Sequence, residues 1–283
     1  MQQRARRRFR ATVHYDGSRF HGWQVQPDQR TVQGAVENAL QRLFPEPVRV
    51  TAAGRTDAGV HAVGQEIAYP APPDWTAPEM RRALNAVLPA DVWTEKLTEA
   101  PVRFHPRFDA TARRYVYLVA TSEASASPLR GDRVWALAEP LDEQLLRQGA
   151  ARLPGERSFE AFAKSGQESR GTRCRVERAE WRRTAVGDLC FTIVADRFLH
   201  HMVRYLVEVL VNAARGERPA GDLDALLAGA GDPRPPAPAP AEGLYLDGVR
   251  YPGGWNRAGG VPGLMAADGA GAGGAGDDGE AEA

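Results

Sequence analysis

The chain has 283 residues, which is enough for two domains of ordinary size, each with its own core. Hydrophobic residues make up 43% of it, as in a globular protein, and no run approaches the roughly 18 apolar residues that a membrane span needs. The basic first residues lack the apolar stretch of a secretory signal, so we expect a cytoplasmic protein. Two cysteines, Cys174 and Cys190, fit neither a disulfide scaffold nor a cysteine-rich zinc site, and we expect both to be buried.

The formal net charge is zero, but the charges are unevenly distributed. Residues 258–283 carry five acidic side chains and no Lys or Arg, which leaves residues 1–257 with 36 Lys and Arg against 31 Asp and Glu. Most of these cations are arginines, whose forked guanidinium groups bind phosphates and stack on bases. The composition is therefore compatible with a nucleic-acid partner.

The first part of the chain reads β-α-β-β-α-β. Alternating apolar residues predict strands, and Thr31 and Thr76 are the expected N-caps of two helices with apolar faces. The expected elements are a strand at 9–15, a helix at 32–44, strands from 48 and at 61–69, a helix from 77 and a strand at 92–97.

The second part repeats this order after a polar linker. The expected elements are a strand at 113–119, a helix at 141–152, a hairpin of strands at 173–181 and 189–195, helices at 198–214 and 221–227, and a strand at 244–249. Two such units predict an α+β fold with two split-βαβ (ferredoxin-like) halves, whose sheets flank a central cleft. We expect domains at residues 1–105 and 106–253. Residues 254–283 are rich in Gly, Ala and acids, which predicts a disordered tail.

The most distinctive stretch is Ala53-Gly54-Arg55-Thr56-Asp57-Ala58-Gly59-Val60-His61. Its glycines predict a tight turn between two strands, which would present the carboxylate of Asp57 at the end of a sheet. The alternative is an Asx turn, in which Asp57 bonds only its own backbone. Arg55, two residues earlier, could hold the carboxylate ionised or contact an anionic partner.

Two other residues have properties that require an explanation. Tyr115 follows paired arginines at the start of a strand, so an aromatic ring adjoins two cations there; the alternative is an ordinary core tyrosine. Arg204 lies in an apolar helix, and a buried guanidinium is costly unless it is paired, so an acid is expected beside it.

Taken together, these segments make residues 8–252 similar to the TruA family of tRNA pseudouridine synthases. The matching segments are, in order, Tyr15-Asp16-Gly17 with Gly22-Trp23-Gln24, Thr31-Val32-Gln33, Gly54-Arg55-Thr56-Asp57-Ala58-Gly59-Val60-His61, Ala112-Arg113-Arg114-Tyr115, Ser158-Phe159 with Ala161-Phe162, Phe198-Leu199 with His201-Met202-Val203-Arg204, and Pro240-Ala241 with Gly243-Leu244-Tyr245-Leu246. The basic first residues and the acidic last residues depart from the family, but they lie outside these motifs.

The resemblance implies the pseudouridine synthase fold and an isomerase that converts uridine to pseudouridine in the anticodon stem-loop of tRNA, at positions 38–40. It also implies a homodimer and no metal or organic cofactor. Asp57 falls on the family's catalytic aspartate and Tyr115 on the tyrosine that packs on the uracil. Arg204 corresponds to the arginine that pairs with the aspartate, and Arg55 to the residue that fills the space of the flipped nucleotide.

The sequence is also compatible with other functions. A non-catalytic RNA-binding protein or tRNA chaperone on the same scaffold is one alternative, and a metal-dependent hydrolase that uses His14, Asp16, Asp57 and His61 is another. His200 and His201 also suggest a metal site. Neighbouring positions on a helix point about 100° apart, so we do not expect these two side chains to chelate together.

Overall fold

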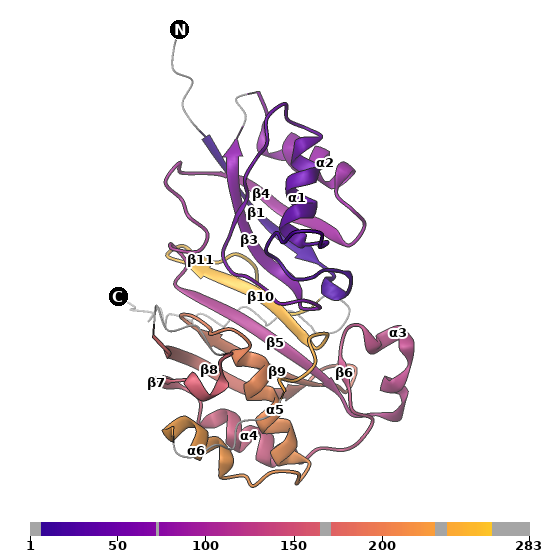
Figure 1. Cartoon of the computed structure of the whole chain (residues 1–283), viewed down its shortest axis with the longest axis vertical. Coiled ribbons are helices and arrows are strands. Elements are labelled where there is room, and N and C mark those ends of the chain that lie inside the picture. Colours follow the sequence, from indigo (N-terminus) through magenta and orange to yellow (C-terminus); the bar gives the residue numbers. More distant parts are fainter. Residues whose placement is uncertain (1–6, 72–73, 165–170, 230–236, 262–283) are drawn as a thin grey trace, which may run out of the picture.

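The computed structural model describes residues 7–71, 74–164, 171–229 and 237–261 (Figure 1). These residues form one continuous mixed sheet with helices packed against it, as Figure 1 shows for α1 and α2 on the upper half and α4, α5 and α6 on the lower half. The predicted α+β class is confirmed.

The first half has the predicted order of elements. They are β1 (Arg7–Tyr15), α1 (Val32–Gln41), β2 (Thr51–Ala52), β3 (His61–Ala71), α2 (Ala77–Val87) and β4 (Val92–Ala100). Both predicted N-caps are confirmed. The side chain of Thr31 accepts a hydrogen bond from the backbone of Gly34, and Thr76 forms a reciprocal capping box with Glu79. The strand expected from residue 48 is confined to the two residues of β2.

The second half contains the predicted elements and several short additions. They are β5 (Ala112–Ala120), α3 (Pro128–Gly131), β6 (Trp135–Ala136), α4 (Glu143–Ala151), β7 (Gly155–Ser158), β8 (Arg173–Arg183), β9 (Leu189–Ala195), α5 (Met202–Ala214), α6 (Asp222–Ala228), β10 (Leu244–Tyr251) and β11 (Gly254–Trp255). The described residues also include the 3₁₀ turns η1 (Gly17–Arg19) in the first half and η2 (Glu123–Ala126) and η3 (Glu160–Phe162) in the second. The short elements β6, β7 and β11 and the helix α3 were not predicted.

The strand order shows that the two halves are built alike. The sheet runs β4-β1-β3-β10-β5-β9-β8-β7. In the first half β1 lies between β4 and β3, and in the second half β5 lies in the same way between β10 and β9. This is the arrangement of a split-βαβ unit.

The halves join where β10 runs parallel to the start of β3, with Tyr245 opposite His61 and Leu246 opposite Ala62. The two backbones approach closely at Gly64, where an added Cβ would lie 2.2 Å from the carbonyl oxygen of Asp247. The first half therefore meets the second directly through the sheet.

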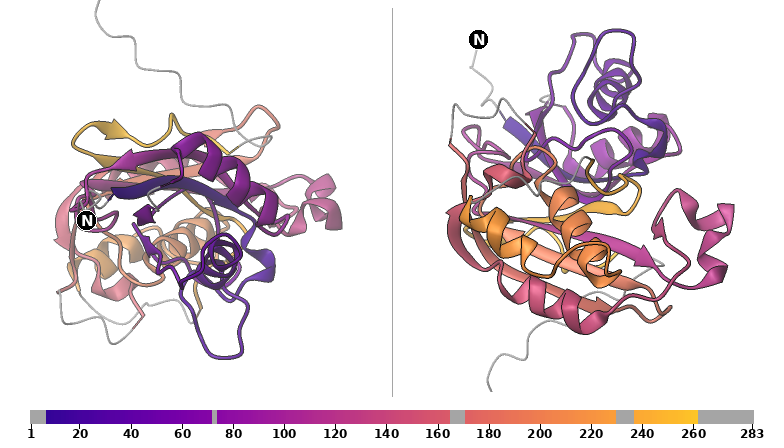
Figure 2. Two further views of the ribbon diagram at one scale, coloured as in Figure 1. Left: turned by 90° about the horizontal axis from the view of Figure 1, so that it is seen from above. Right: turned by 60° about the horizontal axis from the view of Figure 1, so that its bottom comes forward.

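The helices cover the sheet through their apolar faces. Met80 and Leu84 of α2 are fully buried, as the sequence pattern predicts. In the second half α4, α5 and α6 pack together beside β8 (Figure 2), and nine of the thirteen residues of α5 are buried. Neither cysteine is part of a disulfide, and both are buried, as predicted. None of the helices in the described ranges has the length and apolar character that a membrane crossing requires.

The predicted start of the disordered tail at residue 254 is wrong. Residues 254–261 continue the fold, because β11 pairs with β10 and Val261 is buried. The amide of Asn256 donates hydrogen bonds to the carbonyl oxygen of Gly64 at 3.0 Å and to the carboxylate of Glu66 at 2.9 Å. Acidic and Gly-rich composition dominates only later, at residues 262–283, which lie outside the described residues.

Candidate active site

The turn at residues 53–61 is held by side chains from β3 and β1. The amide of Gln65 in β3 donates to the carbonyl oxygen of Gly54 at 2.9 Å and accepts from its N–H at 3.4 Å. The hydroxyl of Thr56 bonds that of Tyr15 in β1 at 2.8 Å. These bonds fix the residues immediately before Asp57, so the position of Asp57 is set by the sheet.

The carboxylate of Asp57 faces the second half of the molecule. Its Oδ1 lies 3.0 Å from Nε2 of His200, and its Oδ2 lies 3.4 Å from Nε2 of His201 and 3.8 Å from Nη1 of Arg204. The side chain is 22% exposed. Within the described part of the chain these contacts cross between the halves, so the Asx alternative, with bonds only to the local backbone, receives no support.

The two histidines reach Asp57 because the helix starts later than predicted. We expected a helix from residue 198, but α5 begins at Met202 and His201 is its N-cap in the left-handed region, with φ 65°. The backbone reverses there, and the rings of His200 and His201 lie 4.1 Å apart. The argument that the two side chains must diverge was therefore wrong.

One ligand atom from each of Asp57, His200 and His201 lies within 4.8 Å of the others, so these residues could hold a metal ion. Imidazole and carboxylate are ligands that Zn²⁺ and related ions accept. The guanidinium of Arg204 and the N-terminus of α5 add positive charge at the same point, which opposes a cation and favours the carboxylate.

The surroundings keep Asp57 ionised. Burial alone would raise the pKa of its carboxyl group, but the hydrogen bond from His200 and the charges of His201, His200 and Arg204 outweigh burial and lower it. Burial lowers the pKa of His201, against the opposing influence of Asp57. At neutral pH the site thus presents a negatively charged carboxylate.

Tyr115, which belongs to β5, lies near the carboxylate of Asp57. Its ring is 9% exposed and stands edge-on to that of Phe198, with centroids 4.9 Å apart. An added Cβ at Gly54 would lie 3.8 Å from the hydroxyl oxygen of Tyr115, so the ring abuts the 53–61 turn. Burial, reinforced by the charge of Asp57, raises the pKa of the Tyr115 hydroxyl well above its usual range.

Arg204 has the acidic neighbour that its burial predicts. Its side chain is 14% exposed, and Nε donates to the carbonyl oxygen of Ala239 at 2.6 Å while Nη1 approaches Asp57. Arg55 is exposed, and among the described residues it makes no hydrogen bond or ion pair. The structure therefore brings Asp57, Tyr115 and Arg204 together and leaves Arg55 accessible on the same turn.

The four residues of the hydrolase alternative do not form one site. Nε2 of His14 lies 3.4 Å from Glu95, whereas Nδ1 of His61 lies 3.3 Å from Asp16 and accepts a bond from a backbone N–H at η1. Asp57 instead faces the histidines before α5.

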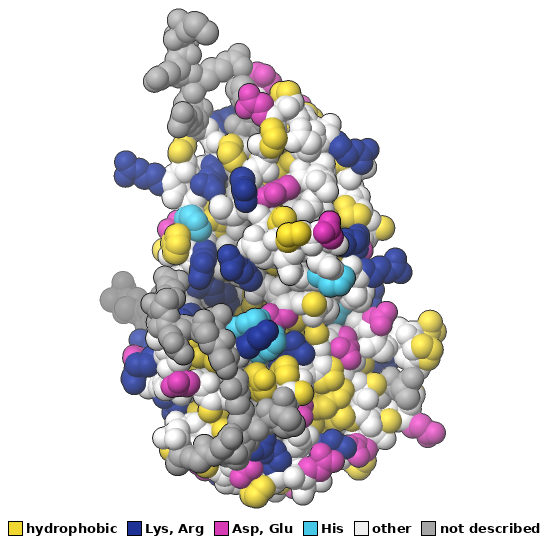
Figure 3. Space-filling model, viewed as in Figure 1, with side chains coloured by type: hydrophobic (Ala, Val, Ile, Leu, Met, Phe, Trp, Pro, Cys, Tyr) yellow, Lys and Arg dark blue, Asp and Glu magenta, His cyan; other side chains and the backbone are white. Residues whose placement is uncertain are grey.

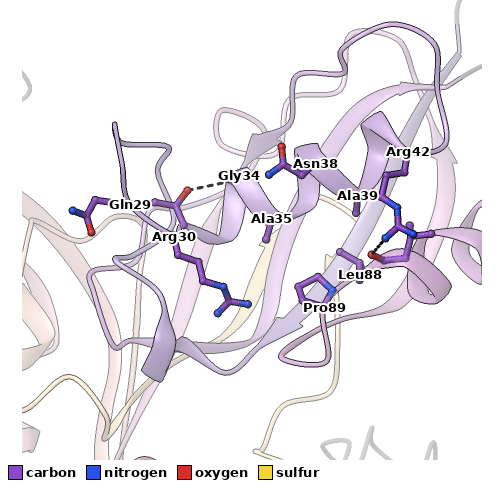
Figure 4. Close-up of a pocket in the computed structure, with 11 residues that line it drawn as sticks. Gln29, Arg30, Gly34, Ala35, Asn38, Ala39, Arg42, Leu88 and Pro89 are labelled. Atoms are coloured by element: carbon purple, nitrogen blue, oxygen red, sulfur yellow. Dashed lines mark hydrogen bonds between the residues drawn. The ribbon is translucent and has the colours of Figure 1, made fainter.

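A cavity of about 500 Å³ lies elsewhere, between α1 and the residues that follow α2 (Figure 4). Figure 4 shows Arg30 and Arg42 near its two ends, and Arg42 bonds the carbonyl oxygen of Val87 at 3.3 Å. Its lining includes none of the predicted site residues. We place the candidate site by the convergence of charged side chains on Asp57, not by cavity size.

Sequence reasoning missed the histidines as partners of Asp57, and it missed Arg113. The Arg113 guanidinium donates to the carbonyl oxygens of Ala53 at 3.2 Å and Asp196 at 2.9 Å, so it ties the 53–61 turn to the second half. His200 and His201 stand just before Arg204 in the sequence, and this position could have indicated that they lie near Asp57. The prediction of a continuous helix from residue 198 obscured that signal.

The chain is similar to known proteins over most of its length. The family described as tRNA pseudouridine synthase matches residues 11–109 and 150–252. A tRNA pseudouridine synthase A of Thermotoga petrophila is 39% identical over 246 residues, which cover 87% of this chain and all of the relative. Proteins of the same name from Frankia casuarinae, 42% identical over 87% of this chain and 89% of the relative, and Xanthobacter autotrophicus, 37% identical over 86% and 99%, are also similar.

Both matched ranges contain residues of the site, with Asp57 in the first and the histidines and Arg204 in the second. The matched relatives are covered over nearly their whole length, and the fold is that of two split-βαβ halves. The chain belongs to the tRNA pseudouridine synthase family, whose members are isomerases.

Proposed function

We propose that this protein converts uridine to pseudouridine in the anticodon stem-loop of tRNA, with Asp57 as its catalytic group. The observation that carries the proposal is the ionised carboxylate of Asp57, which is held at the meeting point of the two halves by His200, His201 and Arg204. Family membership supports tRNA as the substrate.

The reaction needs such a carboxylate. The bond between N1 of uracil and C1′ of the ribose breaks, and its electron pair leaves with the base. The uracil turns, C5 bonds to C1′, the C5 proton is lost and N1 takes up a proton. A carboxylate beside C1′ can add to the electron-poor sugar carbon and leave again when C5 bonds to C1′. Alternatively, it acts as a base while C1′ is cationic, taking the C2′ proton and returning it when C5 bonds to C1′.

Tyr115 and Arg55 have supporting roles in this proposal. The ring of Tyr115 packs against the uracil face, and the raised pKa of its hydroxyl keeps the group protonated at neutral pH. The packing role therefore has stronger support than a second role, in which Tyr115 would act as the base that removes the C5 proton of the uracil. Arg55, exposed on the turn, fills the space that the extruded nucleotide leaves, where a planar cation can stack on the neighbouring bases.

The proposal includes a homodimer in the cytoplasm and a reaction without metal or organic cofactor. The net positive charge of residues 1–257 is compatible with tRNA as a partner. The chemistry above uses only the side chains of the protein and the substrate itself.

The test is release of tritium from unmodified tRNA that carries [5-³H]uridine, with the full chain and with excess chelator present in a parallel sample. We expect release in both samples, with pseudouridine in the anticodon arm of the product. A protein that binds this tRNA tightly but releases no tritium would be an RNA-binding protein, and activity that disappears with chelator would indicate a metal enzyme.

A further inference from the structure

The segment before β5 presents an aromatic side chain to solvent. Phe108 is 65% exposed, more than any other aromatic residue in the described ranges. Leaving a ring of this size in water forgoes the burial energy that a core position would provide. An exposed ring of this kind is a candidate contact for a partner.

The loop that carries Phe108 is anchored to the fold. The hydroxyl of Tyr251 donates to the carbonyl oxygen of Pro106 at 2.8 Å, and the guanidinium of Arg113 donates to that of Arg107 at 2.7 Å. Inside the loop, Nδ1 of His105 accepts the N–H of Arg107 at 3.1 Å. The ring is thus presented by a pre-organised backbone, which lowers the entropy cost of binding through it.

The same loop adjoins the candidate active site. Nη2 of Arg113 bonds the carbonyl oxygens of both Arg107 and Ala53, so the loop and the 53–61 turn share one guanidinium group. Arg113 and Tyr115 are two positions apart on β5, and alternate residues of a strand point to the same face. The loop and Asp57 therefore lie on one side of the sheet.

The chemistry around the ring fits a nucleobase. The His105 ring lies 4.3 Å from that of Phe108, and the Arg107 guanidinium lies over it at 5.9 Å. Arg103 precedes Phe108 in the same segment and is exposed. Arg55 is exposed on the 53–61 turn, which the Arg113 guanidinium links to this loop. In the view of Figure 3, Lys and Arg side chains gather around the middle of the molecule. An exposed aromatic ring beside arginines suits a base with its phosphates better than an apolar protein surface.

We propose that Phe108 is a stacking platform for an unpaired base of the tRNA, next to the uridine that reaches Asp57. The inference rests on the proposed function, because it assumes that the RNA lies across the Asp57 site. Stacking holds the flanking nucleotide after the target has left the helix, and so it offsets part of the cost of extrusion.

The test compares Phe108→Ala, Phe108→Trp and the control Leu129→Ala, whose side chain is 91% exposed on α3. Each change is made in the full chain with and without Asp57→Asn, and tRNA affinity is measured by fluorescence anisotropy. Loss of one stacked base predicts about 10- to 100-fold weaker binding for Phe108→Ala. Phe108→Trp should restore affinity, and Leu129→Ala should leave it unchanged.

A second arm identifies the base. Abasic nucleotides are placed one at a time in the anticodon arm, and at the partner position Phe108→Ala should cause no additional loss of affinity. Unchanged affinity of a folded Phe108→Ala variant, or equal extra loss at every abasic position, would overturn the inference. Because binding is read in the Asp57→Asn background, this result is independent of whether the protein forms pseudouridine.

Discussion

Replacing Arg204 by Met tests how the charge of Asp57 is maintained. Met has a similar length and fills the same buried space, but it removes the guanidinium that lies 3.8 Å from Oδ2 of Asp57. It also removes the bond from Nε to the carbonyl oxygen of Ala239. Arg204→Lys is the matched variant, because it keeps a positive charge without the fork.

The expected magnitude follows from Coulomb's law. At 3.8 Å the gross attraction is about 4 kcal/mol with an effective dielectric constant of about 20. Solvent screens part of this attraction, because the side chains of Arg204 and Asp57 are 14% and 22% exposed, and the two histidines remain in the variant. We therefore use about half of the gross attraction as the expected loss. Removing about 2 kcal/mol of stabilisation from the ionised carboxylate makes this form about 30-fold rarer. This ratio applies at pH values below the pKa of Asp57 in both the wild type and the variant.

The assay is the single-turnover rate of pseudouridine formation with saturating enzyme, measured from about pH 3 to about pH 8, because the lowered pKa of Asp57 places the wild-type acid limb at low pH. Removing a neighbouring cation raises the pKa of Asp57, so the acid limb of the profile moves to higher pH in Arg204→Met. The rates of the variant and wild type should approach each other at the alkaline end. Arg204→Lys should keep most of the wild-type acid limb.

An acid limb in a folded Arg204→Met variant that coincides with that of the wild type would refute this reasoning. The free energy of unfolding depends on pH in the same direction. A carboxylate with a lowered pKa contributes stability at neutral pH, and that contribution is lost as the pH falls through the pKa of the folded protein.

Two further predictions use the same fold. His200→Leu removes the hydrogen bond to Oδ1 of Asp57 and should move the acid limb to higher pH, whereas His200→Gln can still donate and should stay near wild type; coincident profiles for all three proteins would contradict this role. Gly64→Ala places a Cβ 2.2 Å from the carbonyl oxygen of Asp247, and should lower the free energy of unfolding by about 1–3 kcal/mol in a denaturant titration. An unchanged free energy of unfolding would contradict this prediction and show that the backbones of β3 and β10 can move apart at Gly64 without cost.

Local patterns were sufficient for most of the fold. Alternation and helical periodicity located the long strands and helices, and the caps at Thr31 and Thr76 were readable because each satisfies N–H groups within its own first turn. Strands of two to four residues, such as β6 and β11, contain too few residues to show a period. They exist because a neighbouring strand offers free backbone groups, which no local pattern reveals.

The junction of the halves and the histidine contacts also depend on distant residues. The parallel pairing of β3 with β10 joins residues far apart in sequence, so the sequence predicted two sheets but not their continuity. The start of α5 was misplaced because Phe198 and Leu199 extend its apolar pattern, whereas His201 takes a left-handed conformation. Arg204 was found by a different argument, the cost of a buried unpaired charge, which holds wherever the partner lies.

The most direct measurement compares wild type with Asp57→Asn on unmodified tRNA, with pseudouridine mapped by mass spectrometry and binding measured in parallel. Asn keeps the size of the side chain but lacks the charge that the two histidines and Arg204 surround. We expect wild type to form pseudouridine in the anticodon stem-loop and Asp57→Asn to bind the same tRNA without forming it. Pseudouridine formed by Asp57→Asn at the wild-type rate would contradict the assignment of Asp57 as the catalytic group.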